Sequence, residues 1–108
     1  MTSALEGIKV IDLSQVAAVP MCARHLADFG ADVIHVENLV GGDSWRSFQE
    51  MQAKAMAGVP SKINYNWETY NRNKRSMTLD VAKEGGRKVL DRLIEKGDIL
   101  YSPCQGKN

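Results

Sequence analysis

The stretch Ile8-Lys9-Val10-Ile11-Asp12-Leu13 decides the fold that this sequence predicts. It is mostly apolar and rich in β-branched side chains, which is typical of a strand buried on both faces of a parallel sheet. A second run of this kind, Val33-Ile34-His35-Val36, follows after a segment long enough for one helix. Two such strands with a helix between them form a βαβ unit, so we expect them to be parallel neighbours.

The segment between the two strands has the signals of a loop followed by a helix. Pro20 fits the first turn of that helix, because its missing N–H would be unpaired there in any case. Cys22, Leu26 and Phe29 then fall at positions i, i+4 and i+7 and form one apolar stripe. Gly30 stands where the helix is expected to end.

Four further segments complete the pattern. Residues 45–57 have helix-forming composition, and we interpret them as a loose helical excursion. Residues 76–81 alternate apolar and polar side chains, as in an edge strand with one solvated face. Residues 84–96 have the pattern of an amphipathic helix that packs on a sheet, and one more strand is expected over 98–101.

Together these segments predict an α/β fold, with one Rossmann-like βαβ module over residues 1–108 and a short, mostly parallel sheet. The expected strands lie near residues 8–13, 33–36, 76–81 and 98–101, and the expected helices near 20–29, 45–57 and 84–96. A chain of this length leaves much apolar surface uncovered, so we expect a homodimer.

The composition excludes several classes of protein. Hydrophobic residues make up 44% and charged residues 25% of the chain, which indicates a globular rather than a disordered protein. The net charge is +1 without long runs of one sign, which argues against a nucleic-acid partner. The first residues lack the pattern of a secretory signal, and no apolar run is long enough to cross a membrane. We therefore expect a soluble, cytoplasmic protein without a membrane partner.

Neither the cysteines nor the histidines have the spacing of a metal site. Cys22 and Cys104 lack a second Cys or His at ligand-like spacing, and we interpret them as reduced core thiols. His25 and His35 have no acid, thiol or second His nearby on the same face in the sequence. We interpret both as packing or surface residues. The sequence therefore predicts no metal.

Four blocks of sequence carry a recognisable set of motifs. Three of them are Gly7-Ile8-Lys9-Val10-Ile11-Asp12-Leu13-Ser14, Leu26-Ala27-Asp28-Phe29-Gly30-Ala31-Asp32-Val33-Ile34-His35-Val36-Glu37 and Gly42-Asp43-Ser44-Trp45-Arg46. The fourth is Asn71-Arg72-Asn73-Lys74-Arg75-Ser76. These blocks resemble the N-terminal portion of the family III coenzyme A transferases, and the fourth is similar to the Asn-Lys-Arg-Ser signature of that family. Formyl-, carnitine- and bile-acid-CoA transferases and α-methylacyl-CoA racemase belong to it. The resemblance covers nearly the whole chain.

The resemblance implies CoA as the ligand. The family segment that lines the CoA site corresponds here to Gln15, Val16, Ala17 and Ala18. Small side chains allow the backbone to approach a ligand closely, and a helix N-terminus behind them favours an anion. Arg72, Lys74 and Arg75 offer positive charge to the CoA phosphates, and Lys74 matches a ligand-contacting position of the family. The alternatives are an ordinary strand-to-helix connection and a solvated basic turn.

The family's catalytic aspartate, which forms mixed-anhydride and thioester intermediates, is expected beyond Asn108, so no catalytic residue is assigned. Three hypotheses follow. The chain is a truncated CoA-transferase-like module that binds CoA or an adenine nucleotide without transferase activity alone. In the second hypothesis it is a homo-oligomeric interaction or assembly protein that has lost the ligand site, with Trp45, Phe48, Met51 and Met56 covering a core or a partner rather than a ligand. In the third, it is a transferase half completed in trans by a partner chain.

Overall fold

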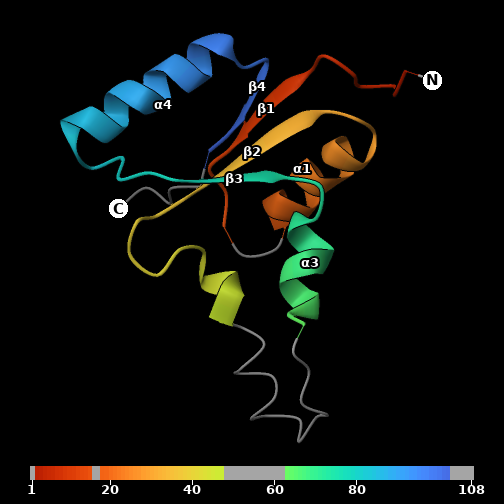
Figure 1. Ribbon diagram of the computed structural model, residues 1–108, viewed down its shortest axis with the longest axis horizontal. Coiled ribbons are helices and arrows are strands. Elements are labelled where there is room, and N and C mark those ends of the chain that lie inside the picture. The colour runs from red at the N-terminus through yellow and green to blue at the C-terminus, as the bar shows by residue number, and fades with distance from the viewer. Residues whose placement is uncertain (1, 16–17, 48–62, 103–108) are drawn as a thin grey trace, which may run out of the picture.

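The computed structural model describes residues 2–15, 18–47 and 63–102. Its centre is one parallel sheet of four strands: β1 (Lys9–Asp12), β2 (Asp32–Glu37), β3 (Arg75–Thr78) and β4 (Ile99–Tyr101). The strands lie in the order β3-β2-β1-β4, so β1 and β2 are central and the other two form the edges (Figure 1). Val10 of β1 pairs with Val33 of β2. This pairing confirms the predicted α/β fold and its βαβ unit.

Helix α1 (Ala18–Asp28) connects β1 to β2 and ends at the predicted glycine. The N–H of Gly30 donates to the carbonyl of Ala27 at 3.0 Å. The N–H of Ala31 donates to the carbonyl of Leu26, also at 3.0 Å. These two bonds form a Schellman cap, which requires a positive φ at Gly30, and its φ is 104°. A Cβ there would also clash with the Cβ of Ser3, so both conformation and space require glycine.

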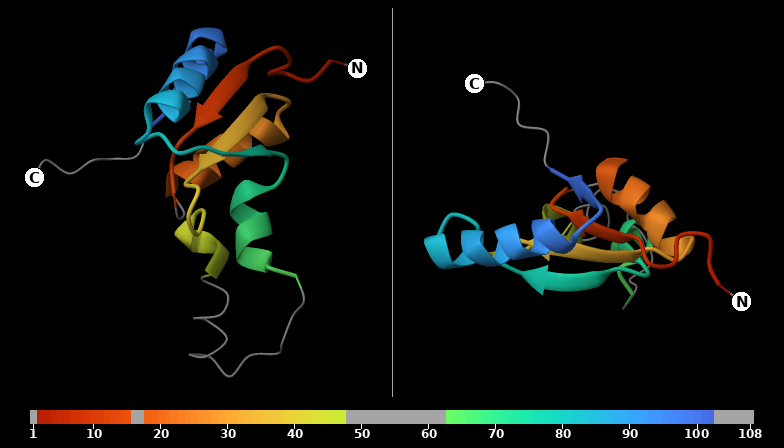
Figure 2. Two further views of the ribbon diagram at one scale, coloured as in Figure 1. Left: turned by 60° about the vertical axis from the view of Figure 1, so that its left-hand side comes forward. Right: turned by 90° about the horizontal axis from the view of Figure 1, so that it is seen from above.

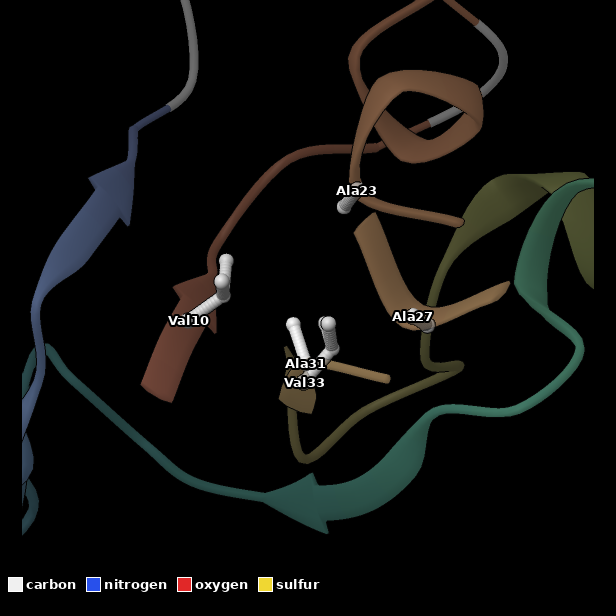
Figure 3. Close-up of a cluster of buried hydrophobic side chains, with 5 residues drawn as sticks. All are labelled: Val10, Ala23, Ala27, Ala31 and Val33. Atoms are coloured by element: carbon white, nitrogen blue, oxygen red, sulfur yellow. The ribbon is translucent and has the colours of Figure 1, made fainter. Parts of the chain in front are cut away.

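The hydrophobic core lies between α1 and the sheet. Its buried side chains are Val10, Ala23, Ala27, Ala31 and Val33 (Figure 3). The predicted apolar stripe on α1 is therefore wrong in part, because Phe29 is 60% exposed and Cys22 is also exposed. The helix turns alanines toward the valines of the sheet, since small side chains let it pack closely there, and Leu26 packs only at the margin.

The 3-10 helix η1 (Ser44–Ser47) and helix α3 (Tyr65–Asn71) lie side by side, below the sheet in the view of Figure 1. The indole N–H of Trp45 donates to the carbonyl of Asn66 at 3.2 Å. The sequence does not predict α3, whose first turn is capped by the side chain of Asn64. Of the predicted helix over 45–57, the described part is a single 3-10 turn. The rest, with Phe48, Met51 and Met56, lies outside the described residues.

Helix α4 (Glu84–Lys96) lies on the opposite side of the sheet from α1 (Figure 2). Successive strand residues point to opposite faces, so Val10 faces α1 while Ile11 approaches Gly97 at the end of α4. Within α4, which the structure describes in full, no residue is buried, and Val89 is 39% exposed. The amphipathic pattern predicts this helix correctly, but the sheet covers its apolar face only in part. None of the helices in the described ranges is long and apolar enough to span a membrane.

Strand β3 is an edge strand, as predicted, but it ends at Thr78 rather than continuing to Val81. The N–H of Leu79 still donates to the carbonyl of Glu37, and the chain then turns at Asp80. The carboxylate of Asp80 accepts the N–H of Ala82 at 3.1 Å. An aspartate that captures the N–H two residues later competes with a strand, and the alternating pattern does not reveal this.

Candidate functional site at the carboxyl end of the sheet

The chain reverses its winding across the sheet at β1. From β1 it adds β2 and β3 on one side, and it then places β4 on the other side. In open α/β sheets, ligands bind at such a switch point, outside the carboxyl ends of the strands. Here the N–H of Leu13 donates to the carbonyl of Tyr101 at 2.9 Å, which joins the two strand ends. The segment containing Gln15 leaves β1 at this point and leads into α1.

A row of three buried side chains lies behind this edge. The ring of His35 in β2 places Nδ1 2.9 Å from Oδ2 of Asp12 and Nε2 3.2 Å from Oδ2 of Asp43. Asp12 ends β1 and is the register partner of His35, whereas Asp43 belongs to the connection between β2 and η1. All three side chains are at most 2% exposed. The ring of His35 therefore links carboxylates from two separate segments.

Lys74 supplies a cation to this cluster from the connection between α3 and β3. Its Nζ donates to Oδ2 of Asp12 at 2.9 Å and to the carbonyl of Pro20 at 2.8 Å. A third bond goes to Oδ1 of Asn71 at 2.9 Å. An ammonium group has three N–H donors, so the chain itself uses them all. Lys74, whose side chain is 2% exposed, thus ties β1, α1 and α3 together at one point.

Burial and charge shift the pKa values of this cluster in opposing directions. Burial raises the pKa of Asp12, but hydrogen bonds from His35 and Ser14 and the charge of Lys74 outweigh it and lower that pKa to about 2. Burial lowers the pKa of His35, yet its bonds to Asp12 and Asp43 raise that pKa overall. Burial lowers the pKa of Lys74, against the attraction of Asp12. At neutral pH, Asp12 is therefore an ionised carboxylate that accepts hydrogen bonds from its neighbours.

A second ion pair, centred on Glu37 in β2, lies beside the first cluster. Arg46 of η1 donates to both carboxylate oxygens of Glu37 at 2.7 Å, and its guanidinium lies 3.7 Å from the centroid of the Trp67 ring. The N–H of Asp43 and the hydroxyl of Ser76 also donate to Glu37, at 2.9 and 3.1 Å. The bonds from Arg46 outweigh burial and lower the pKa of Glu37 to about 2. This pair holds η1 against β2 and α3.

The structure brings Lys74 and the predicted loop together. Gln15 and Ala18 are exposed at the carboxyl end of β1, while Val16 and Ala17 lie outside the described residues. Lys74 bonds to the residue that ends β1 and to a carbonyl in the first turn of α1, so it contacts both sides of this loop.

The structure places the two predicted arginines elsewhere. Arg72 pairs with Asp28 at the end of α1, where Nη2 and Oδ2 are 3.0 Å apart. Arg75 pairs with Asp32 at the start of β2, with Nη2 and Oδ2 2.7 Å apart. Both carboxylates lie toward the amino ends of the strands, so the arginines and the loop after β1 lie toward opposite ends of the sheet.

Sequence reasoning missed the cluster around His35. The available signal was that Asp12 and His35 are polar residues inside runs expected to be buried on both faces, where each needs a partner. His25, by contrast, is exposed. The expectation of a core thiol at Cys22 is wrong, because this exposed residue places Sγ 3.2 Å from the hydroxyl of Tyr101. Cys104 lies outside the described residues. Within the described part of the chain, no group of His, Cys, Asp and Glu is arranged to hold a metal ion.

Comparison with known proteins identifies the family. The sequence model of CoA-transferase family III matches residues 5–107. The chain is 40% identical over 99 residues to the succinyl-CoA–L-malate CoA-transferase beta subunit of Chloroflexus aurantiacus, which covers 92% of this chain and 23% of that protein. It is also 40% identical over 100 residues to a formyl-CoA:oxalate CoA-transferase of Bradyrhizobium, covering 93% of this chain and 22% of that protein.

The fold agrees with the sequence. A crystal structure of a CAIB/BAIF family protein from Brucella suis superposes with a TM-score of 0.76 and 31% identity, covering 93% of this chain and 25% of that one. The chain thus spans about a quarter of the length of the relatives that it matches. From the match over residues 5–107, together with the parallel sheet it encodes, the chain belongs to CoA-transferase family III.

Proposed function

We propose that this chain is a CoA-binding module that holds CoA, or another adenine nucleotide, at the carboxyl end of β1 through the loop over residues 15–18. The observation that carries the proposal is the switch of winding at β1, because α/β sheets bind ligands at that position. The relatives reported above are named as CoA-transferases, which supports CoA as the ligand class.

The loop has the properties that an anionic ligand needs. Helix α1 begins at Ala18, and the first N–H groups of a helix have no partner within it. These groups and the helix dipole favour a phosphate or a thioester oxygen. Ala18 is exposed and carries only a methyl group, which leaves the backbone accessible. Lys74 supports the loop from within, through Asp12 before it and Pro20 after it.

Arg72 and Arg75 have a different part in this proposal. Their side chains are 53% and 66% exposed and are held by Asp28 and Asp32. Each guanidinium has five N–H donors, of which Nε and Nη2 contact the aspartate, so a CoA phosphate would bind the remaining donors or displace the carboxylate. The substitution Arg75→Gln tests this role: a fall in CoA affinity supports it, and an unchanged dissociation constant removes Arg75 from the ligand site.

We also propose that the chain alone does not transfer acyl groups. The two carboxylates that contact His35, those of Asp12 and Asp43, are buried and also accept hydrogen bonds from backbone N–H groups. Neither is exposed to a thioester. Acyl-CoA turnover by the purified chain would contradict this proposal, whereas turnover that appears only with a second polypeptide would support a transferase completed in trans.

Titration of the purified chain with CoA tests the central proposal. A ligand that binds only the native state adds RT ln(1 + [L]/Kd) to its stability, about 2.7 kcal/mol at a hundredfold excess over Kd. We expect CoA to raise the melting temperature. A melting temperature that does not move at millimolar CoA would overturn the proposal.

The matched variants are Ala18→Glu and Ala4→Glu, which add the same charge at exposed positions. Glutamate in the first turn of a helix is compatible with folding, so Ala18→Glu is expected to keep the fold and to weaken CoA binding by repulsion. Ala4→Glu lies before β1, at the other end of the strand, and is expected to bind like the wild type. Equal binding by all three proteins would place the ligand elsewhere.

Self-association is a second candidate function, favoured by the apolar side chains that α4 and β4 leave exposed. Val89, Ile94, Ile99 and Leu100 are each between 38% and 43% exposed. Ile99 and Leu100 point to opposite faces of the sheet edge, so only Leu100 shares a face with α4. Apolar side chains that the fold leaves exposed can be buried by a partner chain. We expect sedimentation to show a dimer that Ile94→Lys disperses and that Val40→Lys, a change at an exposed residue outside α4 and β4, leaves intact. A monomeric wild type would exclude this function.

A further inference from the structure

His35 stands between two turns of the same kind. Oδ1 of Asp12 accepts the N–H of Ser14 at 2.9 Å, and Oδ1 of Asp43 accepts the N–H of Trp45 at 3.0 Å. In each turn, an aspartate holds the amide two residues later with one oxygen. The other oxygen of each aspartate faces the ring of His35. The ring therefore touches both the segment that leaves β1 and the segment that enters η1.

The geometry also bears on the protonation of the ring. A neutral imidazole has one N–H and one lone pair, so it can donate to only one of two carboxylates. Nδ1 and Nε2 of His35 lie 2.9 and 3.2 Å from oxygens of Asp12 and Asp43. An imidazolium has two N–H groups and satisfies both partners. With His35 protonated, each ring N–H has a buried carboxylate as its acceptor, and Lys74 lies against the same Asp12.

We propose that His35 is a buried imidazolium that couples the turn from Asp12 to Ser14 with the turn from Asp43 to Trp45, and so positions the chain where it leaves β1 at Ser14. The charged groups that face it are Asp12 from β1, Asp43 from the connection after β2, and Lys74 from the connection before β3. Helix α3 contributes the uncharged ring of Trp67, whose centroid is 5.8 Å away. Only the consequence for CoA rests on the proposed function.

Coupling follows because both turns depend on the same ring. Removing the proton from His35 leaves one carboxylate facing a nitrogen lone pair, and that carboxylate must move or take up a proton. The aspartate that moves carries with it the amide that it holds. Asp80 and Ala82 form a third turn of this kind, at 3.1 Å, with no contact to His35 among the described hydrogen bonds. This third turn is an internal control.

The first test is nitrogen NMR of the histidine rings in the wild-type chain. We expect both ring nitrogens of His35 to be protonated at neutral pH, and the exposed ring of His25 provides a second signal for comparison. A neutral ring with one unprotonated nitrogen, paired with a protonated Asp43, would overturn the proposal. This measurement needs no variant, so it does not depend on the folding of an altered protein.

The second test follows backbone amides as the pH rises above 6.5, the ordinary pKa of histidine. The amide signals of Ser14 and Trp45 should shift with one midpoint, shared with the His35 ring, while the amide of Ala82 should not. A glutamine side chain does not titrate and would donate to only one carboxylate. His35→Gln should therefore abolish the shared midpoint, and His25→Gln should keep it. Independent midpoints for Ser14 and Trp45 would overturn the coupling.

A third measurement separates this proposal from the proposed function. If CoA binds, its affinity should fall as the pH rises through the His35 midpoint, because the loop loses its support. Binding that does not change across that midpoint would overturn the positioning role. If CoA does not bind at any pH, the proposed function fails, while the ring and amide signals still decide whether His35 couples the two segments.

Discussion

The ammonium group of Lys74 shows how much one side chain can carry in a small domain. It is buried, and its three acceptors come from β1, α1 and α3. Its partner Asp12 also holds Ser14 and His35. Removing one member of a buried ion pair leaves the other charge without compensation, which is far more costly than losing a surface pair. Replacing a buried lysine and replacing a surface lysine are therefore expected to change the free energy of unfolding by very different amounts.

Lys74→Met should lower the free energy of unfolding by about 3–5 kcal/mol, because Asp12 would remain charged and buried without its cation. Lys88→Met provides the matched control, since Lys88 pairs with Glu84 on the surface at 3.3 Å and is 73% exposed. Lys88→Met should change the free energy of unfolding by no more than about 0.5 kcal/mol. Urea unfolding of both variants measures the difference. Equal effects would mean that the Lys74 contacts contribute nothing beyond those of a surface pair.

The stability of the chain should be greatest in mildly acidic solution. The pKa of His35 is raised from 6.5, so its contribution is complete below pH 6.5 and is lost as the pH rises through the folded-state pKa. The pKa values of Asp12 and Glu37 are lowered from 3.8 and 4.5 to about 2, so their contributions are present above those ordinary values and are lost as the pH falls toward 2. The Asp12 shift corresponds to on the order of 2 kcal/mol. The free energy of unfolding, measured with urea at each pH, should therefore be greatest between the acidic range where Asp12 and Glu37 lose their contribution and the range above pH 6.5 where His35 loses its own. A free energy of unfolding that still rises above pH 6.5 would contradict the assignment for His35.

At the scale of elements, the first turn of α4 rests directly on the turn that ends β3. A Cβ built on Gly86 would clash with the carbonyl oxygen of Asp80, whereas a Cβ on the adjacent Gly85 meets nothing within 4 Å. Backbone carbonyls cannot move aside as a flexible side chain can. The two neighbouring glycines therefore have different roles, although both lie within the same helix.

Gly86→Ala should destabilise the chain, because it pushes the start of α4 off the Asp80 turn. Gly85→Ala should instead stabilise it by up to about 1 kcal/mol, since alanine has a higher helix propensity than glycine. Thermal unfolding compares the two variants at matched composition. If Gly86→Ala were as stable as Gly85→Ala, the close contact between α4 and Asp80 would not exist.

At the scale of the whole molecule, the two faces of the sheet differ sharply. The cluster of five buried side chains lies on the face under α1 (Figure 3). On the other face the strands bury Ile11 and Val36, but α4 buries none of its own residues (Figure 2). Elements with little buried apolar surface unfold locally at a lower cost in free energy than the core does. The central strands and α4 should therefore not unfold as one unit.

Native-state hydrogen exchange in low urea should detect this difference. We expect the amides of α4 to exchange through an opening that leaves β1 and β2 protected, with the central strands exchanging only on global unfolding. The contrast between Val33→Ala and Val89→Ala is a second check. Truncating the buried valine should cost about 2 kcal/mol, and truncating the partly exposed one much less. Identical opening free energies for α4 and β1 would show that the chain is a single cooperative unit.

By itself, the sequence determined the parallel β1–α1–β2 unit, the edge position of β3, the helix over 84–96 and the family, because β-branched runs, helical periodicity and glycine signals are local. The loop after β1 and Lys74 as parts of a CoA site stay predictions. Tertiary structure alone decided that alanines rather than Phe29 face the core, that α3 forms, and that the two arginines pair toward the amino ends of the strands. It alone brought together Asp12, His35, Asp43 and Lys74, which come from four different strands and connections. The physical reason is that a buried charge needs its partners in space, and only the pairing of strands and the return of distant loops supply them.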